Sequence, residues 1–249
     1  MSALILPDWP APARVAAVAT TRRGGCSRPP FADLNLGDHV GDDPAAVAAN
    51  RRHLHQLLPE LPAEPLWLRQ VHGNHCVHAE AITADTQADA CVTRHPAQVC
   101  AILSADCLPI LLCDETGTVV AAAHAGWRGL AAGVIESTVA AMERPGANLM
   151  AWLGPAIGPA AFEVGEDVHD AFTRGDSAAR AAFRPRNGGV GGKWWCDLYQ
   201  LARLRLKRLG VERISGGEHC THGNPDLFFS HRRDRQTGRM ASLIWLRPL

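Results

Sequence analysis

Short apolar runs along the chain predict seven β-strands. The runs are rich in Val, Ile, Leu and Ala and lie at residues 14–20, 65–69, 98–103, 110–113, 119–124, 150–153 and 242–246. Runs of this length between turn residues are typical of strands rather than helices.

Helical spacing appears between some of these runs. Pro44 follows Asp42 and Asp43, a capping pattern that predicts a helix continuing over residues 45–58. Two more helices are expected at residues 130–142 and at residues 197–209, where Gly210 ends the pattern. Because strands and helices are mixed rather than strictly alternating, the pattern favours an α/β fold, a single-domain mixed α/β sandwich, over a doubly wound parallel sheet.

The least patterned stretch is Gly-rich and spans residues 174–193. We expect it to be a loop within one domain covering residues 1–249, because the residues after it are few for a separate core.

Composition narrows the classes of partner. The 249 residues carry 25 Lys and Arg against 25 Asp and Glu, so there is no basic field to collect nucleic acid or anionic lipid. The apolar run at residues 101–113 contains Asp106 and Pro109 and is too short to span a bilayer. We therefore expect no nucleic-acid or membrane partner. The N-terminal residues lack the pattern of a secretory signal, so the expected compartment is the cytoplasm.

Three clusters place metal-competent side chains at the ends of apolar runs. They are Arg-Gln-Val-His-Gly at residues 69–73, Ser-Ala-Asp-Cys-Leu-Pro at 104–109 and His-Ala-Gly-Trp-Arg-Gly at 124–129. Together His72, Cys107 and His124 supply three zinc ligands and leave a fourth position open, as in catalytic zinc sites. Their spacing matches no compact zinc motif, and a hydrogen-bonded core histidine is the commoner explanation for either His alone.

The turn at residues 124–129 has a second interpretation. Its glycines, the following helix start and Arg128 suit a bound phosphate, but a tight strand-to-helix turn with a surface arginine explains the pattern equally well. Glu163 follows a Gly-Pro-rich loop at residues 154–159. The Ser-His-Arg-Arg-Asp run at residues 230–234 is either a solvated face or a second place for arginines to meet phosphate.

These clusters, in this order, resemble the bacterial YfiH-like family. The family is described as polyphenol-oxidase-type laccases, as purine nucleoside phosphorylases and as peptidoglycan editing factors. The motifs that carry the resemblance extend over nearly the whole chain: Asn-Leu-Gly-Asp-His-Val-Gly-Asp-Asp-Pro at 35–44, the three clusters above, Ala-Asp-Ala at 88–90, Gly-Pro-Ala-Ile-Gly at 154–158 and Arg-Arg-Asp at 232–234.

The resemblance implies that His72, Cys107 and His124 are metal ligands, for zinc or, in the laccase description, copper. It also implies central β-sheets flanked by helices, reminiscent of certain cysteine hydrolases. Two positions depart from the family pattern. His231 stands where an aromatic residue, commonly Tyr, is expected, and Ala202 replaces a frequent Asn. Both concern substrate detail rather than the metal.

The implied reaction is phosphorolysis of adenosine, inosine or S-methyl-5′-thioadenosine, with adenosine deamination as a side activity. A purine nucleoside and phosphate would then be the partners. The candidates for binding substrate or phosphate are Arg128, Gln70, Arg232, Arg233 and Asn35. The candidates for acid–base work on the leaving purine are Asp89, Asp106 and Glu163.

Three alternatives remain open. Cys107 is the nucleophile, with His124 as its base, if the chain is a hydrolase editing peptidoglycan precursors. A copper polyphenol oxidase is the next alternative, although the chain lacks the several His-x-His pairs of multicopper oxidases. A metal-binding module without enzymatic activity is the last.

Overall fold

Most of the strands form two β-sheets that pack face to face. The computed structural model describes residues 2–189 and 191–248. One sheet has the order β1 (Leu4–Ile5), β2 (Val15–Thr20), β13 (Met240–Leu246), β5 (Val99–Ser104). The other has the order β12 (Arg213–Gly216), β8 (Leu149–Leu153), β6 (Leu108–Asp114), β7 (Val120–Ala125), β4 (Ala90–Thr93), β3 (Cys76–His78). The pairs β12–β8 and β3–β4 are parallel and the others antiparallel, so the second sheet is mixed.

Both faces of the central strands are buried, which explains their apolar runs. In β6, Ile110 and Leu112 face the helices, whereas Leu111 and Cys113 belong to the core between the two sheets. Successive side chains of a strand point to opposite faces. A strand with a hydrophobic core on each side is therefore apolar at every position.

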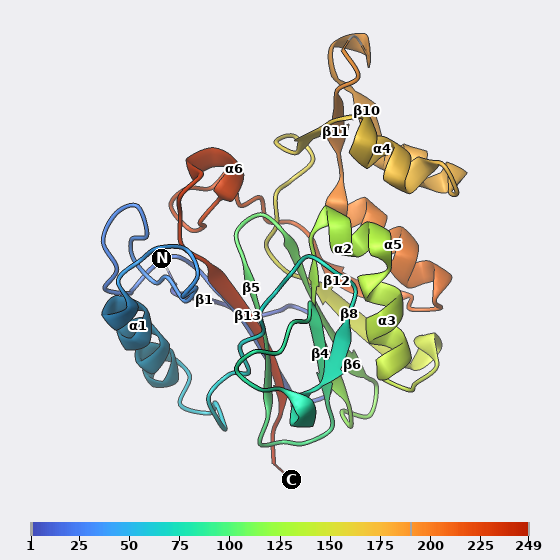
Figure 1. The fold of residues 1–249 in the computed structure, drawn as a ribbon. Coiled ribbons are helices and arrows are strands. Elements are labelled where there is room, and N and C mark those ends of the chain that lie inside the picture. Colours follow the sequence, from blue (N-terminus) through green and yellow to red (C-terminus); the bar gives the residue numbers. More distant parts are fainter. Residues whose placement is uncertain (1, 190, 249) are drawn as a thin grey trace.

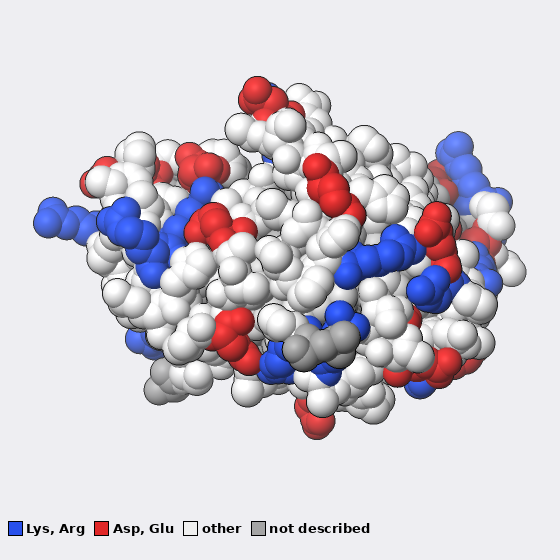
Figure 2. Space-filling view, turned by 90° about the horizontal axis from the view of Figure 1, so that it is seen from below, with Lys and Arg blue, Asp and Glu red and all other residues white. Residues whose placement is uncertain are grey.

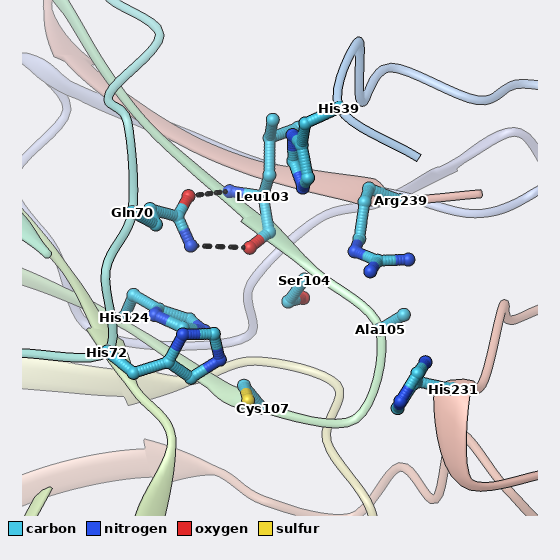
Figure 3. A pocket seen from close by; sticks show the side chains of 10 residues that line it. All are labelled: His39, Gln70, His72, Leu103, Ser104, Ala105, Cys107, His124, His231 and Arg239. Atoms are coloured by element: carbon cyan, nitrogen blue, oxygen red, sulfur yellow. Dashed lines mark hydrogen bonds between the residues drawn. The ribbon is translucent and has the colours of Figure 1, made fainter. Parts of the chain in front are cut away.

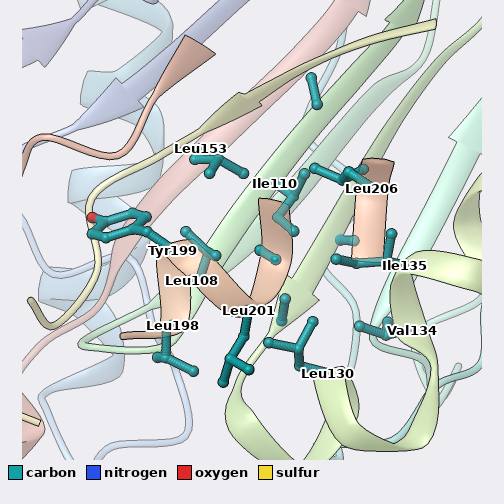
Figure 4. Packing of buried hydrophobic residues seen from close by; sticks show 14 of the residues in the cluster. Leu108, Ile110, Leu130, Val134, Ile135, Leu153, Leu198, Tyr199, Leu201 and Leu206 are labelled. Atoms are coloured by element: carbon teal, nitrogen blue, oxygen red, sulfur yellow. The ribbon is translucent and has the colours of Figure 1, made fainter. Parts of the chain in front are cut away.

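Helices cover the outer face of each sheet (Figure 1). Helix α1 (Pro44–Leu57) packs on the four-stranded sheet, and α2 (Trp127–Ala132), α3 (Val134–Ala141) and α5 (Leu198–Arg208) lie on the other side of the molecule. In Figure 4, leucines of α5 interlock with Leu108 and Ile110 of β6. The layers are helix, sheet, sheet, helix, so the predicted single-domain mixed α/β sandwich is confirmed.

The capping residues explain the helix boundaries. The Asp43 carboxylate accepts from the backbone N–H of Ala45 at 2.9 Å, and Asp197 accepts from Gln200 N–H at 2.9 Å. The helix predicted at residues 130–142 is wrong as one element. It begins earlier and breaks at Gly133, whose φ of 95° is left-handed and separates α2 from α3.

The strand predicted at residues 65–69 is also wrong, because only isolated bridges form there, from Leu66 to Cys100 and from Arg69 to Gln87. The Gln70 amide explains this. Its Nε2 donates to the Leu103 carbonyl at 2.9 Å and its Oε1 accepts from the Leu103 N–H at 2.8 Å. A side chain thus occupies the backbone groups of β5 that a neighbouring strand would use.

The Gly-rich stretch at residues 174–193 contains more structure than a loop. It holds η3 (Ser177–Ala182), β10 (Phe183–Pro185) and η4 (Arg186–Gly189). Strand β10 pairs with β11 (Trp194–Cys196), which pairs with β9 (Glu163–Val164), and α4 (Glu166–Thr173) lies beside this small sheet. Residue 190 lies outside the described residues. The remaining short elements are η1 (Ala79–Ala81), η2 (Gly146–Asn148) and α6 (His231–Asp234).

Surface charge is mixed on the face shown in Figure 2, where acidic and basic side chains are interspersed. Within residues 2–189 and 191–248, none of the helices combines the length and apolar character that crossing a bilayer requires.

Candidate metal centre and its flanking pockets

Three predicted ligands from separate parts of the chain meet at one end of the six-stranded sheet. Cys107 directly precedes β6, and His124 lies near the end of β7. The antiparallel register, in which Pro109 faces His124, brings them together. His72 approaches from a loop, and its ring meets that of His124 edge-on with centroids 4.8 Å apart. One ligand atom from each residue lies within 4.8 Å of the others.

Asp89, next to β4, holds two of these ligands from behind. Its Oδ1 accepts from the His72 N–H at 2.9 Å and from His124 Nδ1 at 2.8 Å. Its Oδ2 accepts from the N–H groups of Gly73 at 2.6 Å and Val71 at 3.2 Å. These bonds stabilise the left-handed backbone of His72, whose φ is 60°. Because Nδ1 of His124 donates to Asp89, Nε2 is the ring nitrogen left to face the site, and it would bind a metal in its deprotonated form, the usual carboxylate–histidine–metal arrangement.

The electrostatics of the site favour a thiolate. Burial raises the pKa of Cys107, but His124 and His72 outweigh burial and lower it to about 6. Burial lowers the pKa of His124, but the Cys107 thiolate and Asp89 outweigh burial and raise it to about 9. Cys113, at the other end of β6, shows the effect of burial without such partners, since its pKa is raised to about 12.

The donor set fits a zinc ion. Thiolate sulfur and neutral imidazole nitrogen are zinc's preferred donors, and tetrahedral bonds of about 2.0–2.3 Å separate ligand atoms by roughly 3.4–3.6 Å. The observed separations, all within 4.8 Å, require only a small contraction. The same donors suit copper, so the geometry supports a metal centre without selecting the ion.

The glycines of the turn at residues 124–129 allow close packing around the ligands. A Cβ on Gly126 would lie 2.9 Å from the Cys107 sulfur, and one on Gly129 would lie 2.6 Å from the Gly73 carbonyl oxygen. Helix α2 thereby packs directly against the His72 loop. From the sequence alone, this turn was either a phosphate-binding turn or a tight structural turn. The close packing explains why both positions are glycine without a bound phosphate.

Two pockets meet at the ligands. The first has a volume of about 250 Å³ and is lined by Gln70, Ser104, His39 and Arg239 beside the three ligands (Figure 3). The second, also of about 250 Å³, is lined by Trp127, Arg128, Ile157, Phe162, Asp106 and Arg232. Both include His72, Cys107, Ala105 and His231, so a ligand spanning the two would pass directly over the metal site.

Besides the three ligands, four of the predicted site residues line these pockets, but two of these four are committed to other contacts. Gln70 is bonded through both amide atoms to β5. Asp106 has a left-handed φ of 89°, and its carboxylate accepts from the hydroxyls of Thr221 at 2.5 Å and Ser230 at 3.0 Å and from the Arg232 N–H at 2.6 Å. Arg128 lies over the Trp127 ring at 4.4 Å, and Arg232 over the Phe162 ring at 5.3 Å.

The other predicted residues line neither pocket. Asp89 is fully buried behind the ligands, and Glu163 forms an ion pair with Arg186. Arg233 donates to the carbonyl oxygens of Thr221, His222 and Phe228. Asn35 is fully buried beneath the first pocket's wall, where its Oδ1 accepts from the backbone N–H of Arg239.

Sequence reasoning missed Arg239, His39 and Ser104, which line the first pocket. His39 lies inside the motif at residues 35–44, which was a usable signal. Arg239 follows Gly238 in no recognisable motif. Of the two departures from the family pattern, His231 lines both pockets, whereas Ala202 is a fully buried residue on the core-facing side of α5.

Comparison with known proteins finds relatives that match nearly the whole chain. Residues 16–247 match a family model described as multi-copper polyphenol oxidoreductase laccase. The chain is 52% identical over 247 residues to purine nucleoside phosphorylase YfiH of Escherichia coli, covering 99% of this chain and 100% of the relative. It is 53% identical over 246 residues to purine nucleoside phosphorylase PA4543 of Pseudomonas aeruginosa, covering 99% of each. The crystal structure of Neisseria meningitidis protein NMB0706, of family DUF152, superposes with a TM-score of 0.94 at 52% identity, covering 99% of this chain and 100% of that one.

Proposed function

This chain belongs to the YfiH-like family, and on that premise we propose that it is a metal-dependent purine nucleoside phosphorylase. The substrates would be adenosine, inosine and S-methyl-5′-thioadenosine, with adenosine deamination as a side activity. The observation that carries the proposal is the His72, Cys107 and His124 set, which opens on two pockets that can hold two reactants side by side.

In phosphorolysis a phosphate oxygen forms a bond to C1′ while the bond from C1′ to the purine nitrogen breaks. The electron pair leaves with the purine, which takes up a proton, and the products are ribose 1-phosphate and free base. Holding both reactants in one geometry removes much of the entropic part of the barrier. A bound zinc, held by the three ligands, would supply positive charge close to the reacting groups.

The chain's own residues would orient the reactants. Arg128 and Arg232 lie over aromatic rings in the second pocket and present cationic edges to a substrate there. Asp89 is a positioning residue, since it fixes the tautomer of His124 and the backbone of His72. Asp106 joins the Cys107 loop to the segment that carries His231 and Arg232.

A second candidate is supported by the same geometry. Cys107, His124 and Asp89 are arranged as a thiol, an imidazole and an orienting carboxylate, which is the order of a cysteine hydrolase. In that case the thiolate would attack the acyl carbon of an amide, the C–N bond would break as the amine takes a proton from His124, and water would hydrolyse the resulting thioester. A peptidoglycan precursor is the proposed substrate. Cys107 cannot act as nucleophile while it is bound to a metal, so metal content separates the two candidates.

The test is to load the protein with zinc or copper and incubate it with each nucleoside, with and without phosphate. Free base and ribose 1-phosphate that appear only with phosphate support the proposal. No product in any metal form contradicts it. The copper form, assayed with a phenol under air, tests the oxidase alternative.

Two cysteine variants, one at the site and one away from it, make this test more specific. Cys107→Ala should lose zinc and activity together, whereas Cys26→Ala, which removes an exposed thiol away from both pockets, should keep both. A Cys107→Ala protein that keeps its zinc but loses activity would favour the thiol hydrolase.

A further inference from the structure

Arg239 is a cation that faces the metal site without a carboxylate partner. Within residues 2–189 and 191–248, no carboxylate lies within 4.0 Å of its guanidinium, and the hydrogen bonds of that group come only from Nη1. Nη1 donates to the carbonyl oxygens of Thr237 at 2.9 Å and Gly238 at 3.1 Å. Nε and Nη2 thus keep donors available, and the side chain is half-buried in the wall of the first pocket.

The position of Arg239 is set by the motif at residues 35–37. Asn35 Oδ1 accepts from the Arg239 N–H at 2.9 Å, and the Arg239 carbonyl accepts from the Leu36 N–H at 3.1 Å. Gly37 lies against the arginine stem, because a Cβ there would come within 2.8 Å of the Arg239 Cγ. Asn35 Nδ2 is in turn bonded to Asp42 at 2.9 Å. This motif therefore seats the stem and leaves the guanidinium pointing into the pocket.

Other donors surround the same space. Figure 3 shows the Arg239 guanidinium extending toward Ser104 and Ala105, with His39 above and to the left of it and His231 below it. Burial and the charge of Arg239 lower the pKa of His39, although Asp38 acts in the opposite direction. A neutral imidazole and a hydroxyl still donate hydrogen bonds to an oxyanion. A planar guanidinium with free N–H groups binds a tetrahedral oxyanion through two parallel bonds.

The second pocket has a different character. Its arginines already lie over Trp127 and Phe162, and Arg232 Nη1 also donates to the Glu163 carbonyl at 2.8 Å. Aromatic and apolar surfaces of this kind suit a flat heterocycle. Displacement at C1′ needs the incoming oxygen and the departing nitrogen on opposite sides of that carbon, and the two pockets meet at the metal ligands.

We propose that Arg239, seated by Asn35 and Gly37, binds the attacking inorganic phosphate in the first pocket, and that the second pocket takes the purine. This inference rests on the proposed phosphorylase function and names the phosphate site within it. Arg239 is then a substrate-binding residue, and Asn35 and Gly37 are positioning residues that act through it.

The test compares Arg239→Met with Arg128→Met in the zinc-loaded protein. The KM for phosphate is measured at saturating inosine and the KM for inosine at saturating phosphate. Arg239→Met should raise the phosphate KM by about 10- to 100-fold, the loss expected for charge-assisted hydrogen bonds, and change the inosine KM by less than about threefold. Arg128→Met should show the opposite preference. Zinc content and circular dichroism check that each variant is folded.

A positioning role for Gly37 predicts non-additivity. Gly37→Ala should raise the phosphate KM by about tenfold in the wild-type background and add nothing in the Arg239→Met background. If Gly37 had only a structural role, Gly37→Ala would lower stability equally in both backgrounds, and its effect on the phosphate KM would not depend on Arg239. If Arg239→Met does not fold, Gly37→Ala and Arg239→Lys, which keeps the charge but loses the planar fork, carry the test.

A direct binding measurement separates this inference from the proposed function. Phosphate is titrated into the zinc-loaded protein without nucleoside and followed by calorimetry or phosphorus NMR. If phosphate binding weakens in Arg239→Met but no nucleoside is cleaved by the wild type, the phosphorylase function fails and the anion site stands. If ribose 1-phosphate forms and the phosphate Kd and KM are unchanged in Arg239→Met, the function stands and this inference is overturned.

Discussion

Replacing Asp89 by Asn should damage both the metal centre and the stability of the fold. The carboxylate accepts four hydrogen bonds, three from consecutive backbone N–H groups and one from His124 Nδ1. An amide keeps one acceptor oxygen and puts an NH₂ group where the other oxygen was. Two donors then face an NH₂ group in a fully buried site.

The consequence depends on which oxygen is replaced, and both cases harm the site. An NH₂ group at the Oδ2 position leaves the N–H groups of Val71 and Gly73 without acceptors, which frees the His72 loop. At the Oδ1 position it donates to His124 Nδ1, which moves the ring proton to Nε2 and blocks the atom that faces the metal. Loss of such a partner typically costs about 10- to 100-fold in metal affinity. Two orphaned donors, at about 1–3 kcal/mol each, cost about 2–6 kcal/mol of stability in total.

The assay is zinc affinity by competition with a chromophoric chelator, together with urea unfolding of the metal-free protein. Asp114→Asn is a matched control, because Asp114 is also buried in this sheet and accepts from two backbone N–H groups and two threonine hydroxyls, with Arg144 3.8 Å away. It lies at the opposite end of β6 from Cys107. The control should lose stability and keep its zinc affinity. A folded Asp89→Asn protein that binds zinc within about threefold of wild type would refute the orienting role of Asp89.

Three further predictions follow from other contacts. Gly126→Ala places a Cβ 2.9 Å from the Cys107 sulfur, so zinc affinity should fall by about tenfold, and an unchanged chelator titration would contradict this. Tyr199→Phe removes a buried hydroxyl that accepts from the Ala156 N–H at 2.8 Å and contacts two carbonyl oxygens, so urea unfolding should show a loss of about 1–3 kcal/mol, and a smaller loss would mean that water replaces the hydroxyl. Burial raises the pKa of Asp114, but its hydrogen bonds outweigh burial and lower it, so its contribution is present above the unfolded value of about 4 and is lost as the pH falls through the folded value. The stability difference between wild type and Asp114→Asn should therefore shrink in acid, and a difference that is constant between pH 7 and pH 3 would exclude this linkage.

Most of the core strands could be predicted because burial makes their local composition apolar, although the short buried strand β4 was not predicted. Strands such as β6 and β7 contact hydrophobic cores on both faces, so an apolar run at the right length is sufficient evidence. Strand β12 escaped prediction because it lies at the sheet edge with all four residues only half-buried. The break at Gly133 was missed because one glycine within an Ala-rich stretch does not by itself reveal a left-handed φ.

The three candidate metal ligands could be predicted from the family resemblance but not from their spacing in the sequence. His72, Cys107 and His124 are far apart in the chain and meet only because the β6–β7 register and the Asp89 carboxylate bring them together. Neither the family resemblance nor residue spacing identified Arg239. Its relation to the site depends on the packing of residues 35–37 against residue 239, a contact between the two ends of the chain that no local pattern encodes.

The three carboxylates predicted for acid–base work are instead engaged in structural contacts. Asp89 and Asp106 lie beside the ligands, yet each is saturated with donors and organises a loop, and Glu163 is paired with Arg186 outside both pockets. His231, in contrast, lines both pockets, and its Nδ1 donates to the Arg235 carbonyl at 2.7 Å, which directs Nε2 away from that bond. The groups that retain unengaged polar atoms beside the metal site therefore include the His231 and Arg239 side chains of the C-terminal segment. Because this segment is fixed by the Asp106 carboxylate, an Asp106 variant should disturb substrate binding through His231 and Arg232 rather than by loss of a proton donor.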